Sequence, residues 1–200
     1  MYKYIKRGLD IILSFVALIV LSPIFLIIVI AIKLDSKGPA VFTQIRLGKD
    51  NKEFKIYKFR TMYTTAPKNV STEEFTDAAS YVTKVGKFLR MTSFDETSQF
   101  FNVLKGDMSI IGPRPLILNI GEWLTLREKS GANRIRPGIT GLAQINGRDD
   151  ISAECKAAYD TEYYKNLSFA LDVKIFFKTF SHLIDHRDYN APQNSDDKDE

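Results

Sequence analysis

An uncharged, largely apolar run over residues 11–32 restricts this chain more than any other feature of its sequence. The run contains no charged residue, and only Ser14, Ser22 and Pro23 interrupt its apolar side chains. A straight α-helix of this length would rise about 33 Å, whereas the hydrocarbon core of a bilayer is about 30 Å thick. The run therefore predicts a membrane-associated helix near the N-terminus.

The proline and the flanks of the run favour a re-entrant helix over a single span. Pro23 lacks a backbone N–H and its ring clashes with the carbonyl four residues earlier, while the Ser22 hydroxyl can bond to a freed carbonyl. Cations flank both ends of the run, and such residues tend to stay on the cytoplasmic side of a membrane. We therefore expect a helix that enters one leaflet, breaks at Ser22 and Pro23, and returns. An ordinary single span, a signal peptide and a buried core helix are the alternatives.

Composition and charge exclude several classes of protein. The chain has 200 residues, of which 44% are hydrophobic and 26% charged, enough to bury the core of one domain. Its single cysteine, Cys155, cannot form an internal disulfide, and no zinc-like spacing is present. The formal net charge is +4, but the last ten residues carry −3, which leaves residues 1–190 at +7. This balance indicates an anionic partner, such as nucleic acid, lipid headgroups or a phosphorylated small molecule.

The remaining pattern predicts an α+β fold in three segments. Residues 1–37 form the membrane-inserted helix, residues 38–190 a folded domain, and residues 191–200 an acidic disordered tail. A β-hairpin is expected from two short β-rich stretches, and helices are expected at four further places. The strands are residues 41–46 and 54–60; the helices are residues 71–90, 93–104, 152–164 and 169–184. The last helix carries a broad apolar stripe that could belong to the core, lie on a bilayer, or pair with a second copy of the chain.

Two adjacent acids, Asp95 and Glu96, are the strongest candidates for chemistry. Ser93 and Glu96 match a capping box, which would put both acids in the first turn of a helix. Acids in that position stabilise a helix without any further role. The same geometry also favours an ionised carboxylate beside a bound phosphate, so Asp95 is a candidate nucleophile for aspartyl-phosphate chemistry. The pair could also supply the carboxylates that Mg²⁺ needs beside substrate phosphates.

Cations and Gly-rich loops provide candidate phosphate ligands. Arg114 is the best of them, because Pro113 and Pro115 fix its backbone and a guanidinium can grip a phosphate with two hydrogen bonds. No P-loop and no GxGxxG motif is present. A soluble nucleic-acid binder is disfavoured, since it needs no membrane segment. The candidate binding residues are Lys58, Arg60, Arg90, Arg114, Arg136, Asn146 and Arg148.

Several blocks together resemble the bacterial sugar transferases of the monotopic phosphoglycosyl transferase family. They are KRGLD, SP, QIRLGKDNKEFKIYKFRTM, LRMTSFDE, FNVLKGDMSIIGPRPL, RPGITGLAQINGR and LDVKIFF, in this order over residues 3–185. The resemblance implies a catalytic domain on the cytoplasmic face of the bacterial inner membrane, anchored in one leaflet. It implies transfer of a phosphosugar from a UDP-sugar to undecaprenyl phosphate with release of UMP, as the first step of a surface polysaccharide or glycoconjugate.

The resemblance also assigns roles to residues. It makes Asp95 the nucleophile and Glu96 its partner, with Mg²⁺ required, and it places Arg90, Arg114, Arg136, Asn146 and Arg148 in blocks that line the site. The chain departs from the family pattern at Thr97 and Ser98, where Leu-Pro or Leu-Leu is usual, and at Leu142, where an aromatic residue is common. A non-catalytic, membrane-tethered basic scaffold and a lipid-linked diphosphate hydrolase are the alternatives.

Overall fold

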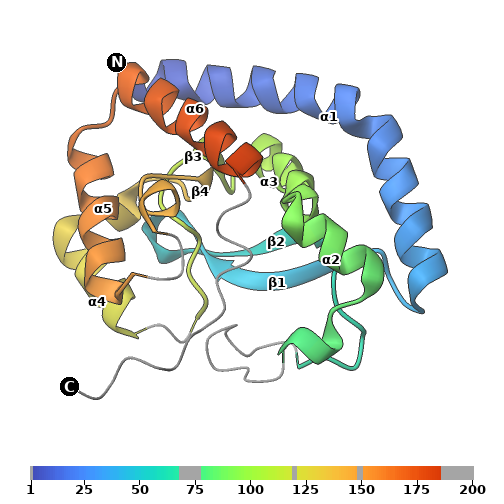
Figure 1. The fold of residues 1–200 in the computed structure, drawn as a ribbon. Coiled ribbons are helices and arrows are strands. Elements are labelled where there is room, and N and C mark those ends of the chain that lie inside the picture. Colours follow the sequence, from blue (N-terminus) through green and yellow to red (C-terminus); the bar gives the residue numbers. More distant parts are fainter. Residues whose placement is uncertain (1, 68–77, 119–120, 148–150, 186–200) are drawn as a thin grey trace.

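The computed structural model describes residues 2–67, 78–118, 121–147 and 151–185, in which helices surround two small sheets (Figure 1). The mixed helix and strand architecture is as expected. The helices are α1 (Tyr2–Asp35), α2 (Lys84–Met91), α3 (Phe100–Lys105), α4 (Gly121–Ser130), α5 (Ala153–Lys165) and α6 (Phe169–Asp185), and the strands are β1 (Val41–Leu47), β2 (Glu53–Phe59), β3 (Ser109–Ile111) and β4 (Gly138–Thr140). Short 3₁₀ segments are η1 (Lys49–Asn51), η2 (Ala78–Tyr81), η3 (Phe94–Gln99), η4 (Ala132–Arg134) and η5 (Gln144–Asn146).

Helix α1 is continuous through Pro23 and changes direction part-way along its length (Figure 1). The Ser22 hydroxyl donates to the carbonyl of Ile19 at 2.8 Å, the acceptor that Pro23 leaves without an amide partner. This predicted hydrogen bond is confirmed. The helix is not interrupted at Ser22 and Pro23, where a break is expected, and the hydroxyl supplies the donor that the proline lacks. Helix α1 is long and apolar enough to cross a membrane.

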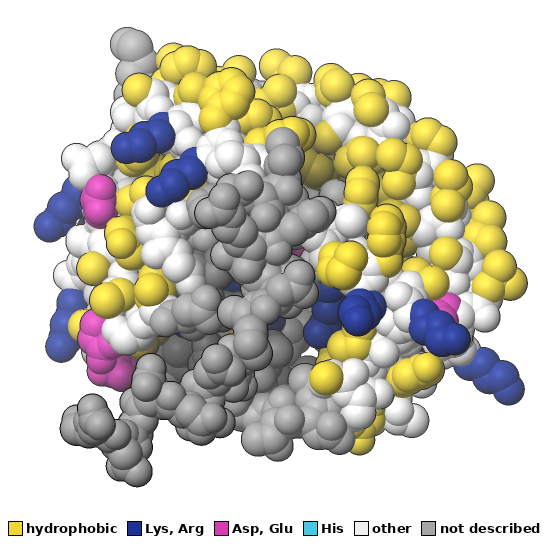
Figure 2. All heavy atoms as spheres, viewed as in Figure 1, with side chains coloured by type: hydrophobic (Ala, Val, Ile, Leu, Met, Phe, Trp, Pro, Cys, Tyr) yellow, Lys and Arg dark blue, Asp and Glu magenta, His cyan; other side chains and the backbone are white. Residues whose placement is uncertain are grey.

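Most apolar side chains of α1 face away from the rest of the protein. Its buried residues are Asp10, Ser14, Ile28 and Ile32. Exposed hydrophobic side chains follow the outer edge that α1 forms in Figure 2, and many of them are more than half exposed. An apolar surface of this extent on an otherwise folded chain is typical of a region that contacts lipid or another protein.

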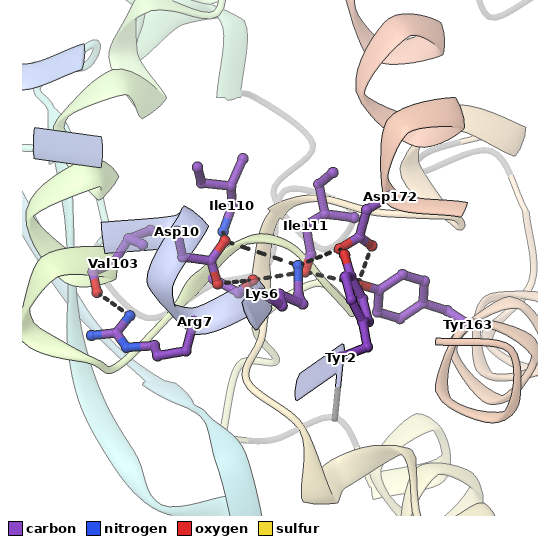
Figure 3. A network of polar contacts seen from close by, with 10 residues as sticks. Tyr2, Lys6, Arg7, Asp10, Val103, Ile110, Ile111, Tyr163 and Asp172 are labelled. Carbon is purple, nitrogen blue, oxygen red and sulfur yellow. Dashed lines mark hydrogen bonds and ion pairs between the residues drawn. The ribbon is translucent and has the colours of Figure 1, made fainter. Parts of the chain in front are cut away.

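The first turns of α1 are joined to α5 and α6 through one buried carboxylate, Asp172 (Figure 3). It accepts hydrogen bonds from the Lys6 ammonium at 2.8 Å, from the Tyr163 hydroxyl at 2.7 Å, and from the Tyr2 hydroxyl. Arg7 donates to the carbonyl of Val103 at 2.7 Å. From the sequence, Lys6 and Arg7 are only cations that flank the apolar run. In the structure, their hydrogen bonds also hold α1 against the folded domain.

A second buried carboxylate, Asp10, yields a stability prediction. Asp10 accepts from the Ser109 hydroxyl at 2.8 Å and from the Ile110 amide at 3.1 Å. We expect Asp10→Asn to lower the free energy of unfolding by about 1–3 kcal/mol, because an amide nitrogen replaces one of two buried acceptors. Thermal unfolding in detergent checks this. Asp50→Asn is the control, since Asp50 is exposed and should change stability by less than about 0.5 kcal/mol. Equal effects in the two variants would contradict the prediction.

The two sheets explain much of the remaining sequence pattern. Strands β1 and β2 form the predicted antiparallel hairpin, with Val41 opposite Phe59. Strands β3 and β4 pair in parallel. A Cβ atom at Gly138 would lie 2.1 Å from the amide nitrogen of Gly112, so this part of the Gly-rich loop needs glycine for backbone packing rather than for a ligand.

Candidate active site

The acidic pair lies on η3, between α2 and α3, and not in the first turn of an α-helix. The expected capping box is wrong, because Ser93 has a left-handed backbone with φ of 55° and its side chain forms no capping hydrogen bond. Helix α2 ends at Met91, and the left-handed residue lets the chain turn into η3. The Ser93 carbonyl, instead of its hydroxyl, bonds to the Glu96 amide at 3.2 Å. Asp95 and Glu96 therefore stand on a tight turn.

The pKa of Asp95 depends on its burial and on the charges of three neighbouring residues. Burial and the neighbouring charge of Glu96 raise the pKa of Asp95, while Lys58 and Arg90 lower it, and the result is a pKa of about 6. The Lys58 ammonium lies 2.6 Å from a Glu96 oxygen. Arg90 is held by a hydrogen bond from its Nε to the Thr61 hydroxyl at 2.9 Å. The structure thus brings together four of the predicted residues, and Asp95 is mainly ionised near neutral pH.

Arg46 also lies near the acidic pair, and it is not among the residues predicted from the sequence. Burial and the nearby charge of Arg114 lower the pKa of Arg46 to about 10, although the charge of Glu96 opposes the shift. Arg114 and Glu96 therefore both lie near enough to act on Arg46. The alternation of side chains along the strands could have indicated Arg46, because the hairpin register puts it on the same face of the hairpin as Lys58.

The Pro-Arg-Pro segment is fixed through its carbonyl groups. Two of its three residues are prolines, which have no N–H, so carbonyl acceptors carry most of its backbone bonding. Each of four consecutive carbonyls accepts a hydrogen bond from a different residue. The pairs are Pro113 with the Gly138 amide at 2.8 Å, Arg114 with Arg127 Nη2 at 2.7 Å, Pro115 with Arg46 Nη1 at 3.4 Å, and Leu116 with the Leu47 amide at 2.9 Å. This bonding sets the position from which the Arg114 side chain extends.

Arg127 belongs to a buried network between α4 and α5. Its Nε and Nη2 both lie 2.7 Å from one oxygen of Asp160, which also accepts from the Trp123 indole at 3.0 Å. The guanidinium lies over the Trp123 ring, 5.0 Å from its centroid. Arg127 and Asp160 are 5% and 1% exposed. A buried pair with this many donors fixes the Arg127 side chain, and through it the carbonyl of Arg114.

The other predicted binding residues have different partners in the structure. Arg60 is buried, and its guanidinium donates to the carbonyls of Ser36 and Lys37, each at 2.7 Å, at the end of α1. Arg136 donates from Nε to the Gly106 carbonyl at 2.7 Å. The Asn146 side chain accepts from the Lys178 ammonium at 2.9 Å. Arg148 lies outside the described residues. None of these contacts is with the acidic pair, so substrate binding by these residues stays a prediction.

Two of the three departures from the family pattern, Leu142 and Thr97, have simple structural roles. Leu142 is 8% exposed and packs in a core cluster with Ile111 and Tyr163, so it is a core residue here. The Thr97 hydroxyl donates to the Phe94 carbonyl at 2.6 Å, inside η3. Neither departure from the family pattern replaces a charged residue of the site.

Comparisons with known proteins show what this chain is similar to. The family described as bacterial sugar transferase matches residues 1–186. A Klebsiella pneumoniae protein named UDP-glucose:undecaprenyl-phosphate glucose-1-phosphate transferase is 45% identical over 181 residues, which cover 87% of this chain and 39% of that protein. An Aeromonas hydrophila protein named UDP-N-acetylgalactosamine-undecaprenyl-phosphate N-acetylgalactosaminephosphotransferase is 41% identical, over 92% of this chain and 44% of that protein. The exopolysaccharide production protein ExoY of Rhizobium meliloti is 37% identical, over 87% of this chain and 83% of that protein. The chain thus spans less than half of the first two relatives and most of the third.

Proposed function

This chain belongs to the bacterial sugar transferase family, a family of transferases, and from this premise we propose that it moves a phosphosugar from a UDP-sugar to undecaprenyl phosphate, releasing UMP. The names of its relatives support the two substrates. They differ in the sugar, glucose in one and N-acetylgalactosamine in another, so the identity of the sugar does not follow from them. The observation that carries the proposal is the half-buried acidic pair with Lys58, Arg90 and Arg46 near it and Arg114 beside Arg46.

The proposed reaction has two displacements at one phosphorus atom. An Asp95 carboxylate oxygen attacks the phosphate attached to the sugar, the bond to UMP breaks, and UMP leaves with that electron pair. A phosphate oxygen of undecaprenyl phosphate then attacks the aspartyl intermediate, forms the diphosphate link, and restores the carboxylate. Such transfers depend mainly on positioning and charge neutralisation, and the cations near the pair, Lys58, Arg90 and Arg46, can supply both.

A divalent cation fits the residues at this site. Within the described residues no group of three or more His, Cys, Asp or Glu could hold a metal, so the acidic pair would contribute only two carboxylates. Mg²⁺ commonly binds one or two carboxylates and completes its shell with substrate phosphates and water. We infer that Asp95 and Glu96 would hold Mg²⁺ together with the UDP-sugar, where it would neutralise charge on the phosphates.

We infer that α1 and α6 set the height of this site at a membrane. The outward side chains of α1 would lie in one leaflet of the cytoplasmic membrane, with the bend returning the helix to the same face. On α6, Phe169, Phe176, Phe177 and Phe180 are 47–67% exposed, so they are not core residues. We assign them to the bilayer surface rather than to a second copy of the chain, because α1 and α6 meet at the Tyr2 and Asp172 contact.

Intact-protein mass spectrometry tests the proposed chemistry. The purified full chain is incubated with Mg²⁺ and a panel of UDP-sugars without a lipid acceptor, beside the Asp95→Asn variant. A mass increase of one phosphosugar in the native protein alone is expected, and the donor that produces it identifies the sugar. If no donor gives an adduct and undecaprenyl phosphate triggers no UMP release, a non-catalytic scaffold explains the protein better. Release of inorganic phosphate without a sugar-lipid product would favour the hydrolase.

The pKa of Asp95 predicts how adduct formation depends on pH. Since only the ionised carboxylate is a nucleophile, the single-turnover rate should rise through about pH 6 and become level above about pH 7. Below the pKa the rate should fall about tenfold per pH unit. Lys58→Met removes a charge that lowers this pKa, so the rise should move to higher pH in that variant. A midpoint that does not move would contradict the assignment of the titration to Asp95.

A further inference from the structure

A pocket with basic walls lies beside the first turns of α1, and its lining includes neither Asp95 nor Glu96. Its walls come from α1, from β3, from residues 135–136 before β4, and from α5. Its lining includes five cations and one carboxylate, Asp10. The cations are Lys3, Lys6, Arg7, Lys49 and Arg136.

The carboxylates near this pocket already have donors. Asp10 accepts from Ser109 and Ile110, and Asp172 accepts from Tyr2, Lys6 and Tyr163. Among the residues that the structure describes, Lys3, Arg7 and Arg136 form no ion pair with a carboxylate. The described part of the pocket therefore carries positive charge that no acid balances.

Two guanidinium groups are held close together in this pocket. Arg7 donates to the carbonyls of Val103 and Leu104, and Figure 3 shows it directed towards Val103 and away from Asp172. Arg136 donates from Nε to the Gly106 carbonyl at 2.7 Å, three residues beyond Val103. Within the described residues, the Nη1 and Nη2 atoms of Arg136 donate to no hydrogen-bond acceptor. Carbonyl bonds thus position two mutually repelling cations at one wall, an arrangement that an anion would stabilise.

The place of the pocket in the chain indicates which anion it would meet. Lys3, Lys6 and Arg7 directly precede the apolar run of α1, so on the proposed membrane placement the pocket lies at the level of the lipid headgroups. It is separate from the acidic pair, which precedes α3, whereas Arg7 and Arg136 bond to the end of α3, about 9 Å further along that helix. We propose that this pocket binds the phosphate group of an anionic phospholipid. The proposal rests on the membrane placement and not on phosphosugar transfer.

Titration calorimetry with a short-chain lipid tests the proposal. The full chain in neutral detergent is titrated with dihexanoyl-phosphatidylglycerol, with dihexanoyl-phosphatidylcholine, and with inorganic phosphate at constant ionic strength. The pocket variant is Lys3→Gln/Arg136→Gln. The control is Lys87→Gln/Lys129→Gln, which removes the same charge from exposed positions on α2 and α4. We expect the dissociation constant for phosphatidylglycerol to rise about tenfold or more in the pocket variant and less than about twofold in the control.

Each outcome decides between sources of the anion. Binding of phosphatidylglycerol alone, with loss only in the pocket variant, supports a lipid headgroup site. Inorganic phosphate that binds equally well with the same loss would overturn the lipid assignment in favour of a free phosphate. Equal losses in both variants, or displacement of the lipid by a UDP-sugar, would overturn a separate site. Because calorimetry needs no transfer reaction, and the adduct assay needs no phospholipid, failure of one proposal is distinguishable from failure of the other.

Discussion

Asp95→Asn is expected to abolish turnover and, at the same time, to make the protein more stable. The loss of turnover should be at least about 10³-fold, because an amide cannot form the covalent intermediate and the remaining groups act together with the nucleophile. The gain in stability follows from the pKa of Asp95, which burial and Glu96 raise from 3.8 to about 6. The folded protein therefore holds this proton more tightly than the unfolded chain.

The sign of the stability effect is fixed by that difference. The contribution of Asp95 is fully present below about pH 4 and is lost as the pH rises through about 6, so at pH 7.5 its ionised form costs the folded state up to about 3 kcal/mol. A neutral asparagine of similar shape removes this cost. Thermal unfolding at pH 7.5 in the same detergent should then show a melting temperature about 2–8 °C above that of the native chain.

A measurement at pH 4 and a control variant test this prediction further. At pH 4 the native carboxyl is largely protonated, so the difference in melting temperature between the two proteins should shrink. Asp50→Asn, at an exposed position, should change neither turnover nor the melting temperature. If Asp95→Asn loses both activity and stability, Asp95 is a structural residue and the proposed nucleophile is wrong.

The residues that the sequence revealed are those with a strong local pattern. Two short β-rich stretches predicted β1 and β2, the cations of the second stretch indicated Lys58, and two consecutive acids indicated Asp95 and Glu96. The same local reasoning was wrong about Ser93, because a capping box presumes a helix that starts there. The chain instead turns after α2 and uses a left-handed residue, and no local pattern distinguishes the two.

The residues that the sequence did not reveal act through contacts between distant segments. Arg60 is one of several cations on the second strand, and only the folded chain shows that it bonds to the end of α1, more than twenty residues earlier. Asp172 and Lys6 are 166 positions apart and meet because α1 and α6 lie together. Arg127, which fixes the carbonyl of Arg114, has no motif around it. Such roles depend on tertiary packing, which a single sequence does not display.

Arg127→Met is expected to lower the free energy of unfolding by about 3–5 kcal/mol, because it leaves the buried Asp160 without its charged partner. Loss of activity in the Arg127→Met variant would therefore not distinguish a positioning role of Arg127 from a loss of folding. A second variant, Arg127→Met/Asp160→Asn, removes both charges and keeps an acceptor for the Trp123 indole, so most of the stability should return.

Activity should not return with stability, and this separates positioning from folding. In the double variant the Arg114 carbonyl still lacks the donor that Arg127 supplies, so the Arg114 guanidinium is no longer held beside Arg46. We expect kcat/KM for the UDP-sugar to stay about 10–100-fold below the native value, as misplacement of a binding group by about 1 Å can cost 10²-fold. Lys156→Met is the matched control, since it removes another buried cation that lies over the same Trp123 ring from α5 and leaves the Arg127 donor in place. A double variant with native stability and native kcat/KM would show that Arg127 serves only the core between α4 and α5.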